Sequence, residues 1–475
     1  MVTVSNVVCP VCGCLCDDLE VEVENGRIIA VRNACSVGEA KFLNYWKHRN
    51  KPMVRKNGEL VEVSIDEAIR KAAEILAEAK YPILYGWSST TCEAIKVGLE
   101  LAEELGGVID NTATVCHGPS LLAIQDVGYP GFTLGQSRHR FDLVIYWGSN
   151  PWSAHFRHLD RYSAFSEGRF QISAWRRAFA KVYARIAAKK MNAASKRTAA
   201  KYAVSPPFGS ELVDTLLRED RKLVVVDVRR TATAFKADYF LQVKPNKDFE
   251  LLQAFRVLVK DGELDVDEVA GVPVELMEEV VDVMINCRVG VLYFGVGLTM
   301  SEGKIRNIEA AINLTKELNA RTKFHILPMR GHYNVTGANV VFAWTTGFPY
   351  AVDFSHGYPY YNPGETSVVD ILCRGETDAS LVIASDPVAN FPKKAVKEMV
   401  SNPLIAIDPA PTPTTLMADV VIPAAYAGIE APGTAYRMDH VPISLRKVVE
   451  PPPGCIPDEV IVKRILNEVR RLRRG

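Results

Sequence analysis

A group of cysteines near the N-terminus has the spacing of a metal site. Cys9, Cys12, Cys16 and Cys35 form the pattern C-x2-C-x3-C-x18-C, and Cys14 is a spare thiol between them. In a chain without a visible export signal, such a group favours metal ligands over disulfides. Four thiolates can hold Zn²⁺ or an iron–sulfur cluster, but zinc ribbons usually show a second C-x2-C pair. The spacing therefore favours a [4Fe–4S] cluster, with zinc and unligated buried thiols as the alternatives.

The residues between the third and fourth cysteines predict a β-hairpin. Residues 19–24 alternate apolar and acidic side chains, Asn25-Gly26 is a favoured two-residue turn, and residues 27–31 run back. A hairpin of this length returns the chain beside its start. We therefore expect Cys35 to join the other three sulfurs.

The composition is that of a globular chain without net charge. Its 475 residues are 48% hydrophobic and carry 56 Lys and Arg against 56 Asp and Glu. This excludes disorder as the main state and predicts two to four compact units. The longest nearly apolar run, residues 289–300, is too short to span a bilayer, and neutrality gives no steering toward nucleic acid. Residues 1–6 show no export signal, so we expect a cytoplasmic protein.

From about residue 60, short β-branched runs alternate with helical periodicity, which is typical of parallel α/β units. Ser64-Ile-Asp-Glu67 has the form of a capping box at the start of one such helix. We expect an α/β protein of several domains with doubly wound, Rossmann-like parallel sheets. Ligands bind at the carboxyl ends of such strands, although the small and acidic residues there also make ordinary turns. The strands are expected at residues 82–87, 142–148, 222–228, 289–295, 323–328, 381–385, 404–408 and 419–423.

Residues 168–210 differ in composition from the rest of the chain. They contain ten Lys or Arg and no acidic residue, and the Ala-rich part, residues 178–203, predicts a basic helix. We interpret this segment as a solvated surface insertion. The alternatives are a docking face for an acidic subunit or anionic ligand, and the product of a shifted reading frame.

Motifs along the chain resemble those of molybdopterin-dependent formate dehydrogenases. Residues 116–120, CHGPS, are similar to their metal-ligating cysteine or selenocysteine and the adjacent histidine. Residues 328–337, PMRGHYNVTG, resemble the segment that places an arginine over the metal. A Cys-His pair alone is weak evidence, because a buried thiol beside a core histidine is more frequent. Further similar segments lie at residues 148–151, 226–229, 243–248, 294–297, 384–387, 411–423, 430 and 433–434.

Within this superfamily the chain is most similar to the catalytic tungsten or molybdenum subunit of the formylmethanofuran dehydrogenases of methanogenic archaea. The similarity covers nearly everything except the basic segment and is closest in residues 9–27, 117–130, 146–151 and 157–161. It implies reversible reduction of CO2 to formate, a step of methanogenesis. The implied cofactors are a tungsten or molybdenum bis(molybdopterin guanine dinucleotide) and a [4Fe–4S] cluster that delivers electrons. Formate would then pass to a sister subunit for condensation with methanofuran.

The resemblance also implies a multi-subunit complex. Its other members would be an amidohydrolase-like subunit, a β-barrel subunit that covers the pterin, and ferredoxin-like electron carriers. The chain stops about 40 residues after Gly433-Thr434, where one-chain formate dehydrogenases continue into the barrel, so we expect no barrel domain here. We expect no nucleic-acid partner and no membrane span. The alternatives are a formate dehydrogenase subunit whose barrel was split off, and a metal-free iron–sulfur subunit with a structural or redox role.

The resemblance assigns three residues to the catalytic centre. Cys116 would ligate the tungsten or molybdenum, because a soft thiolate suits a metal already held by dithiolene sulfurs. His117 would relay a proton or hydrogen-bond the bound carboxyl oxygen. Arg330 would orient CO2 or formate with its permanently charged, bidentate fork. His332, His356 and Asp353 could line a substrate channel, but ordinary hydrogen bonds are the more frequent role of such residues.

Two pterin dinucleotides need contacts to phosphate and guanine. Carboxylates at strand ends can accept hydrogen bonds from guanine, and glycine turns let backbone N–H groups approach pyrophosphate. On these grounds and on the matched segments, the cofactor-binding residues are expected to be Gly148, Ser149, Asn150, Asp227, Arg229, Asn246, Asp248, Gly295, Gly297, Ser385, Asp386, Asp408, Thr412 and Thr415.

Three domains are expected from these assignments. Formate dehydrogenases commonly carry Lys-Gly two residues after the fourth cluster cysteine, whereas Cys35 is followed by Ser36-Val37-Gly38 and the nearest lysine is Lys41. Whether Lys41 lies between cluster and pterin is left open by the sequence. The expected domains are an iron–sulfur domain, 1–54 completed by 425–475, and two α/β pterin-binding domains, 55–112 with 331–424, and 113–330 with the insertion 168–210.

Overall fold

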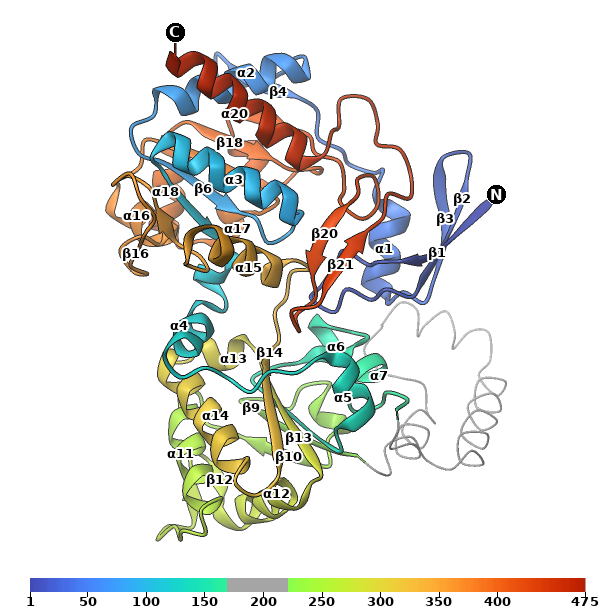
Figure 1. Ribbon diagram of the computed structural model, residues 1–475, viewed down its shortest axis with the longest axis vertical. Helices are drawn as coiled ribbons and strands as arrows, with labels where there is room; N and C mark the ends of the chain where they lie inside the picture. Colours follow the sequence, from blue (N-terminus) through green and yellow to red (C-terminus); the bar gives the residue numbers. More distant parts are fainter. Residues whose placement is uncertain (169–220, 475) are drawn as a thin grey trace. The chain divides into compact units, whose positions relative to one another are not determined.

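The computed structural model describes residues 1–168 and 221–474. The chain folds into two compact units, in which unit 1 comprises residues 1–118 and 330–475 and unit 2 comprises residues 119–329 (Figure 1). The basic helix expected at residues 178–203 lies outside the described residues. In the described part of the chain, no helix is both long and apolar enough to cross a membrane.

Unit 1 begins with a three-stranded antiparallel sheet, β1 (Val2–Val7), β2 (Leu19–Glu24) and β3 (Arg27–Arg32), in the order β1-β2-β3. The predicted hairpin is confirmed, because β2 pairs with β3 and the turn residues Asn25 and Gly26 have φ angles of 50° and 75°. On β2, Leu19 and Val21 are buried, while the glutamates are half-buried or exposed. Helix α1 (Ser36–Asn44) follows, with Cys35 as its N-cap.

A nine-stranded sheet forms the centre of unit 1, in the order β16-β15-β7-β6-β17-β18-β19-β4-β5. The strands from β7 to β19 are parallel, and an antiparallel pair flanks them at each edge. The carboxyl ends of the parallel strands therefore lie at one end of the sheet. The strands are β4 (Met53–Lys56), β5 (Glu59–Glu62), β6 (Pro82–Gly86), β7 (Val108–Asn111), β15 (Val352–Asp353), β16 (Tyr360–Tyr361), β17 (Ala379–Ile383), β18 (Leu404–Ile407) and β19 (Val420–Ile422).

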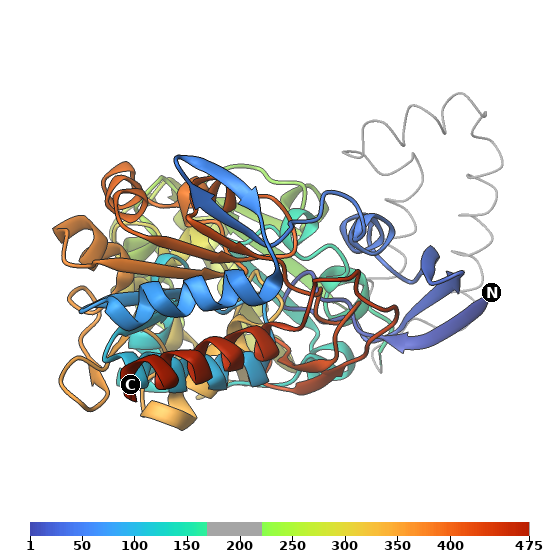
Figure 2. The ribbon, with the colours of Figure 1, turned by 90° about the horizontal axis from the view of Figure 1, so that it is seen from above.

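Helices cover both faces of this sheet, as a doubly wound fold requires. Helices α2 (Ile65–Glu78), α3 (Cys92–Leu105), α15 (Val335–Thr346) and α20 (Asp458–Arg474) share one core with strand residues such as Leu84. Figure 2 shows α20 beside α2 and α3, both of which it contacts. Helices α16 (Val368–Arg374) and α18 (Lys393–Ser401) share a second core with Ile83 and Tyr85. Neighbouring residues of β6 thus point to opposite faces of the sheet.

Helix α2 begins where the sequence predicts, but its cap is only half of the expected box. The Ser64 hydroxyl accepts the amide of Glu67 at 3.1 Å. The Glu67 carboxylate instead pairs with Lys56 Nζ at 2.9 Å. The second half of the box does not form because β4 and β5 bring Lys56 to the start of the helix. There Lys56 competes with the N-cap amide for the Glu67 carboxylate.

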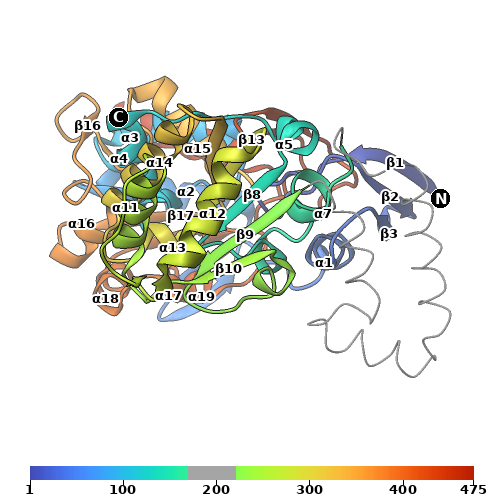
Figure 3. The same cartoon turned by 90° about the horizontal axis from the view of Figure 1, so that it is seen from below.

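Unit 2 contains a fully parallel five-stranded sheet in the order β10-β9-β8-β13-β14. Helices α11 (Asp248–Leu258), α12 (Val274–Asn286) and α14 (Ile305–Leu318) share its apolar core and are seen with the strands in Figure 3. The strands are β8 (Leu143–Trp147), β9 (Lys222–Asp227), β10 (Tyr239–Gln242), β13 (Val289–Phe294) and β14 (Lys323–Pro328).

The α/β fold class with parallel sheets is confirmed, and a strand occurs at each of the eight expected places. The largest shift is at β17, which begins at Ala379 rather than at residue 381. The sequence prediction missed β7 and β10 and the edge pairs. The remaining elements are η1 (Thr112–Val115), η2 (Ala234–Lys236), α4 (Gly118–Val127), α5 (Leu134–Arg140), α6 (Pro151–Ala154), α7 (His158–Tyr162), α13 (Val296–Thr299), α17 (Pro387–Asn390), α19 (Pro413–Met417), β11 (Glu268–Val269), β12 (Val272–Pro273), β20 (Gly433–Tyr436) and β21 (Pro442–Leu445).

Replacement of Gly98, in the middle of α3, should destabilise unit 1. A Cβ at this position would lie 2.3 Å from the fully buried ring of Trp87. Glycine to alanine in a helix usually stabilises by about 0.5–1 kcal/mol, but overpacking a core costs about 1–3 kcal/mol. We expect Gly98→Ala to lower the free energy of unfolding in chemical denaturation. Gly135→Ala in α5 is the control, because the nearest atom to its Cβ is 3.8 Å away; a stabilised Gly98→Ala variant would contradict the steric argument.

Candidate active site

The four cysteines predicted to hold a cluster lie together in unit 1. Cys9 and Cys16 are buried, and the Cys9 amide donates to the Cys16 carbonyl at 2.9 Å. The Sγ atoms of Cys9 and Cys35 lie 3.2 and 3.7 Å from the place that a Cβ on Gly38 would occupy. Burial raises the pKa of the Cys9 thiol, and the charges of Cys16, Cys12 and Cys35 raise it further. The hairpin therefore brings the fourth cysteine back to the first three.

The Cys35 sulfur lies at the start of helix α1. The Cys35 sulfur accepts a hydrogen bond from the Gly38 amide at the start of α1, at 3.4 Å, and helix starts stabilise thiolates. Cys14 is fully buried. Across residues 1–168 and 221–474, no group of three or more His, Cys, Asp or Glu is arranged so that it could hold a metal ion. A cluster on these four sulfurs accordingly remains a proposal.

Cys116 lies in a tight turn after β7. Asn111, the last residue of that strand, caps the turn by accepting the amide of Ala113 at 3.0 Å. The Cys116 amide then closes the turn on the Ala113 carbonyl at 2.9 Å. The Thr112 hydroxyl donates to Ser88 Oγ at 2.6 Å and so ties the turn to the loop after β6. These bonds position the Cys116 side chain at the carboxyl end of the parallel strands.

Arg330 is buried near Cys116. Its side chain is 2% exposed, and one terminal nitrogen donates to Thr336 Oγ1 at 3.1 Å. Burial raises the pKa of the Cys116 thiol to about 11, and the positive charge of Arg330 acts in the opposite direction. His117 is fully buried. All three residues predicted for catalysis thus belong to unit 1, and the fold brings Cys116 and Arg330 together from distant parts of the sequence.

The cysteine loop, residues 9–16, packs directly against residues 330–332, which contain Arg330. The Gly13 amide donates to the Gly331 carbonyl at 3.0 Å, and Cys12 forms an antiparallel bridge with His332. A Cβ on Gly13 would lie only 2.5 Å from the Arg330 carbonyl oxygen. No other residue type fits there without moving one of the two backbones. The position of Arg330 is therefore coupled to that of the cysteine loop.

Lys41 lies among groups from both predicted cofactor sites. Its Nζ is 5.4 Å from the centre of the Tyr426 ring. Burial lowers the pKa of Lys41, while the charges of Cys9 and Asp408 raise it, so both groups lie near the ammonium. Burial raises the pKa of Asp408 to about 6 against the effect of Lys41. The sequence left the place of Lys41 open, and the fold sets it near the cysteine loop and a predicted pterin residue.

A buried ion pair holds the chain around Tyr426. Arg49 lies 3.0 Å from the fully buried carboxylate of Glu430 and stacks over the Tyr426 ring at 4.7 Å. Arg49 also donates to the Ala424 carbonyl at 2.8 Å. Removing one partner of a buried pair leaves an uncompensated charge, so this pair fixes residues 424–430 against the segment after α1.

The other pterin-binding residues predicted in unit 1 follow strands of its large sheet. Ser385 and Asp386 come after β17, and Asp386 accepts the amide and hydroxyl of Thr414 at 3.0 and 2.6 Å. Thr412 and Thr415 cap α19, each side chain accepting the amide of the other at 3.2 and 2.8 Å. These polar groups already support their own loops. A ligand at these strand ends would contact loops that are already held in place by hydrogen bonds within the protein.

In unit 2, Asp227 and Asp248 lie close enough for their charges to interact, and burial raises the pKa of each. Asp248 is 4% exposed and accepts the Trp147 indole N–H at 2.8 Å. Asp227 is only partly buried and accepts the Arg229 amide at 3.2 Å. Asn246 accepts the amide of Glu302 at 3.1 Å. Of the two carboxylates, Asp227 is the more accessible to a ligand.

The glycine turns of unit 2 are hydrogen-bonded to each other. The amides of Gly148, Gly295 and Gly297 donate to the carbonyls of Val226, Trp147 and Gly148 at 2.9–3.0 Å. A Cβ on Gly297 would lie 2.7 Å from Gly148 Cα. The amides of Gly295 and Gly297 thus join the two turns, and contact of these turns with pyrophosphate stays a prediction. Ser149 and Asn150 follow in the same turn, and their amides take no part in these bonds.

A protein-family model for molybdopterin oxidoreductases matches residues 50–468 of this chain. The chain belongs to the molybdopterin oxidoreductase family. Its sequence is 50% identical to the B subunit of tungsten-containing formylmethanofuran dehydrogenase 2 of Methanocaldococcus jannaschii, covering 99% of each chain. The corresponding protein of Methanococcus maripaludis is 45% identical over 98% of this chain and 99% of its own. Within the family, this chain is thus an oxidoreductase of the formylmethanofuran dehydrogenase type.

More distant proteins are also similar. The F420-dependent formate dehydrogenase subunit alpha of M. jannaschii is 22% identical over 98% of this chain and 70% of its own. Acetylene hydratase from Pelobacter acetylenicus superposes with a TM-score of 0.69 at 14% identity, over 99% of this chain and 70% of that chain. A chain of the formyltransferase/hydrolase complex of Methylorubrum extorquens, solved with methylofuran, gives 0.64 at 19% identity over 89% and 100%. At such identities these structures show a shared fold.

Sequence reasoning missed two residues beside Arg330. Gly13 is one, and its only signal was a glycine inside the cysteine motif. His440, in the turn between β20 and β21, is the other; surrounding protein and the Arg330 charge lower its pKa to about 4. The same turn is held to the cysteine loop by the Met438 amide, which donates to the Gly13 carbonyl at 2.9 Å. Nothing in a family motif marks His440, because only folding brings the turn to the arginine.

Gly13→Ala should reduce the turnover rate of this oxidoreductase. The new Cβ must displace the backbone of Arg330, the arginine predicted to act in catalysis, and misplacing such a group by about 1 Å can cost about 100-fold in rate. We expect a loss of that order in steady-state turnover by the native complex. Glu24→Gln, an exposed change at the end of the strand that follows the Gly13 turn, is the control. Wild-type turnover by Gly13→Ala would show that the contact does not position Arg330.

Proposed function

We propose that this chain is the catalytic subunit of a formylmethanofuran dehydrogenase and reversibly reduces CO2 to formate. The observation that carries the proposal is the meeting of Cys116, Arg330 and the cysteine loop in unit 1. It occurs in a chain that is 50% identical, over nearly its whole length, to a tungsten-containing relative with that name. Formate would leave for a sister subunit, where it is condensed with methanofuran.

Cys116 would hold the tungsten or molybdenum of a bis(molybdopterin guanine dinucleotide). When bound, that group supplies the two-electron redox chemistry. Arg330 would bind the carboxyl oxygens through two parallel N–H···O bonds and stabilise the negative charge that grows on them. Because Arg330 is buried, its charge is poorly screened by water and acts strongly. His117 would move the proton that the reduction of CO2 to formate consumes.

Cys9, Cys12, Cys16 and Cys35 would hold a [4Fe–4S] cluster, which supplies electrons to the site. Lys41 would lie between the cluster and the pterin, a role supported by the proximity of its ammonium to Cys9 and Asp408. We further propose the functional division of the chain into the iron–sulfur part, residues 1–54 and 425–475, and two pterin-binding parts, residues 55–112 with 331–424, and residues 113–330.

The partners we propose are an amidohydrolase-like subunit, a β-barrel subunit over the pterin and ferredoxin-like carriers. The support is that the close relatives are named as subunits. The chain spans 70% of the length of the formate dehydrogenase relatives. A complex with an amidohydrolase-like subunit would distinguish this proposal from a split formate dehydrogenase.

Metal analysis of the native complex tests the proposal directly. After anaerobic purification, we expect about one tungsten or molybdenum atom and at least about four iron atoms per copy of this chain, because the ferredoxin-like carriers add iron to that of the one cluster proposed here. Mass spectrometry should find an amidohydrolase-like subunit in the same complex. Iron without tungsten or molybdenum would refute the catalytic role and favour a structural or redox subunit.

Cys116→Ser should separate the metal site from the cluster. Serine keeps the size of the side chain but removes the soft thiolate, so we expect CO2 and formate turnover to fall below detection. The electron paramagnetic resonance spectrum of the reduced cluster should stay unchanged. Cys287→Ser, a substitution of a partly buried cysteine in unit 2, is the matched control. Full activity of Cys116→Ser would exclude Cys116 as the metal ligand.

A further inference from the structure

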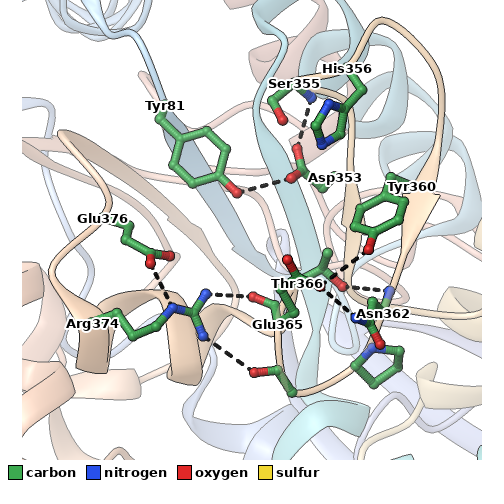
Figure 4. A pocket seen from close by; sticks show the side chains of 12 residues that line it. Tyr81, Asp353, Ser355, His356, Tyr360, Asn362, Glu365, Thr366, Arg374 and Glu376 are labelled. Carbon is green, nitrogen blue, oxygen red and sulfur yellow. Dashed lines mark hydrogen bonds and ion pairs between the residues drawn. The ribbon is translucent and has the colours of Figure 1, made fainter.

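Unit 1 contains a pocket of about 680 Å³ whose lining includes none of the residues assigned above to a cluster, metal or pterin. Figure 4 shows it at the β15–β16 edge of the large sheet, beside the loop that leads to α16. Its volume falls in the range of small-molecule sites, about 300–1,000 Å³. The side chains that decide its chemistry are Tyr81, Asp353, Tyr360, Glu365, Arg374 and Glu376.

A buried carboxylate lies on one side of the pocket. Asp353 is 5% exposed and accepts the Tyr81 hydroxyl at 3.0 Å and the Ser355 amide at 2.7 Å. Burial and the neighbouring Asp353 charge raise the pKa of Tyr81, so its hydroxyl keeps the proton that it donates. Both donors hold the Asp353 carboxylate in place at the pocket wall. The pocket therefore has a fixed negative charge that is partly shielded from water.

The positive charge of the lining is already used. Arg374 donates from Nε to Glu376 at 2.7 Å and from its two terminal nitrogens to the carbonyls of Gly364 and Glu365, at 3.3 and 2.6 Å. Its guanidinium thus links Glu376 to the backbone of residues 364–365. The lining holds three carboxylates and one arginine, so its carboxylates outnumber its arginine. An anionic ligand would be repelled.

Acceptor positions remain on the other side of the pocket. One oxygen of Glu365 accepts the Tyr360 hydroxyl at 3.2 Å, and one oxygen of Glu376 accepts from Arg374. Within the described residues, the second oxygen of each carboxylate accepts no hydrogen bond. A ligand that donates hydrogen bonds would find two acceptors opposite Asp353.

Aromatic rings complete the lining. Tyr360 pairs with Asp353 across β15 and β16, so the ring and the carboxylate leave the sheet on the same side. His356 meets the Tyr360 ring edge-on at 5.4 Å and stacks on Tyr358 at 6.0 Å. Aromatic faces attract cations as well as aliphatic chains. Rings beside carboxylates are the combination that recognises an organic ammonium group.

We propose that this pocket binds an organic cation that carries ammonium or guanidinium groups on an aliphatic chain. Carboxylates at the two sides would take the charged ends, and Tyr81 and Tyr360 would cover the methylene groups. This binding is separate from the proposed redox function, and its failure would leave that function untouched. The cation is either a free amine or a Lys or Arg side chain of another subunit, since both offer the same chemistry.

Calorimetric titration of the full-length chain with 1,4-diaminobutane tests the proposal. We expect saturable one-to-one binding of the diamine and at least about tenfold weaker binding of 1,4-butanediol, which has the same length without charge. No binding of the diamine, or equal binding of the diol, would overturn the proposal.

Variants locate the binding in the pocket. Glu365→Gln removes an exposed charge and Asp353→Asn a buried one, and each should weaken diamine binding by at least about tenfold. Glu78→Gln, exposed at the end of α2, is the matched control and should bind as the wild type does. Tyr360→Leu should weaken binding more than Tyr360→Phe, which keeps the ring. Unchanged affinity in Glu365→Gln and in Tyr360→Leu would overturn the proposal, even if Asp353→Asn does not fold.

The same titration on the native complex identifies the source of the cation. Binding of the diamine by both the single chain and the complex supports a free amine as the ligand. Binding by the single chain alone supports a Lys or Arg side chain of another subunit, which then fills the pocket in the complex.

Discussion

The contact between Gly13 and the Arg330 carbonyl is the constraint on which the active-site side of unit 1 depends. Because Gly13 has no Cβ, its amide reaches the Gly331 carbonyl. The Met438 amide donates to the Gly13 carbonyl. Three segments far apart in the sequence therefore meet at one residue. A small apolar core beside this point holds them together, formed by Val8, Leu15, Tyr333, Ala435 and Leu445.

Buried charge gives this region its chemical character. Cys116 and Arg330 lie in a setting where burial raises the pKa of the thiol, and the arginine is almost free of solvent. The Arg49–Glu430 pair is buried nearby in the fold of unit 1, and Lys41 lies over the same tyrosine as Arg49. Charges taken out of water act strongly and must be matched. For this reason Arg49 has Glu430 beside it, and Lys41 has Asp408 near it.

The two units use their strand ends in different ways. In unit 1, side chains such as Asp386 and Thr412 support loops that could present a ligand site. In unit 2, the amides of Gly295 and Gly297 join two turns to each other. Glycine in such a turn thus has two explanations, close approach to a ligand or close approach to another backbone. Sequence alone does not distinguish them, because both need the same missing Cβ.

Local patterns in the sequence determined the hairpin after Cys16, the start of α2 at Ser64, the parallel strands and the family motifs, because each depends on neighbouring residues. Short strands such as β7 escaped prediction, since their pairing partners are far away in the chain. Only the tertiary structure decided that Arg330 lies near Cys116, that Lys41 lies near Cys9 and Asp408, and that Asp353 and Tyr360 share a pocket. The physical reason is that desolvation and charge pairing act across space, and no spacing along the chain records them.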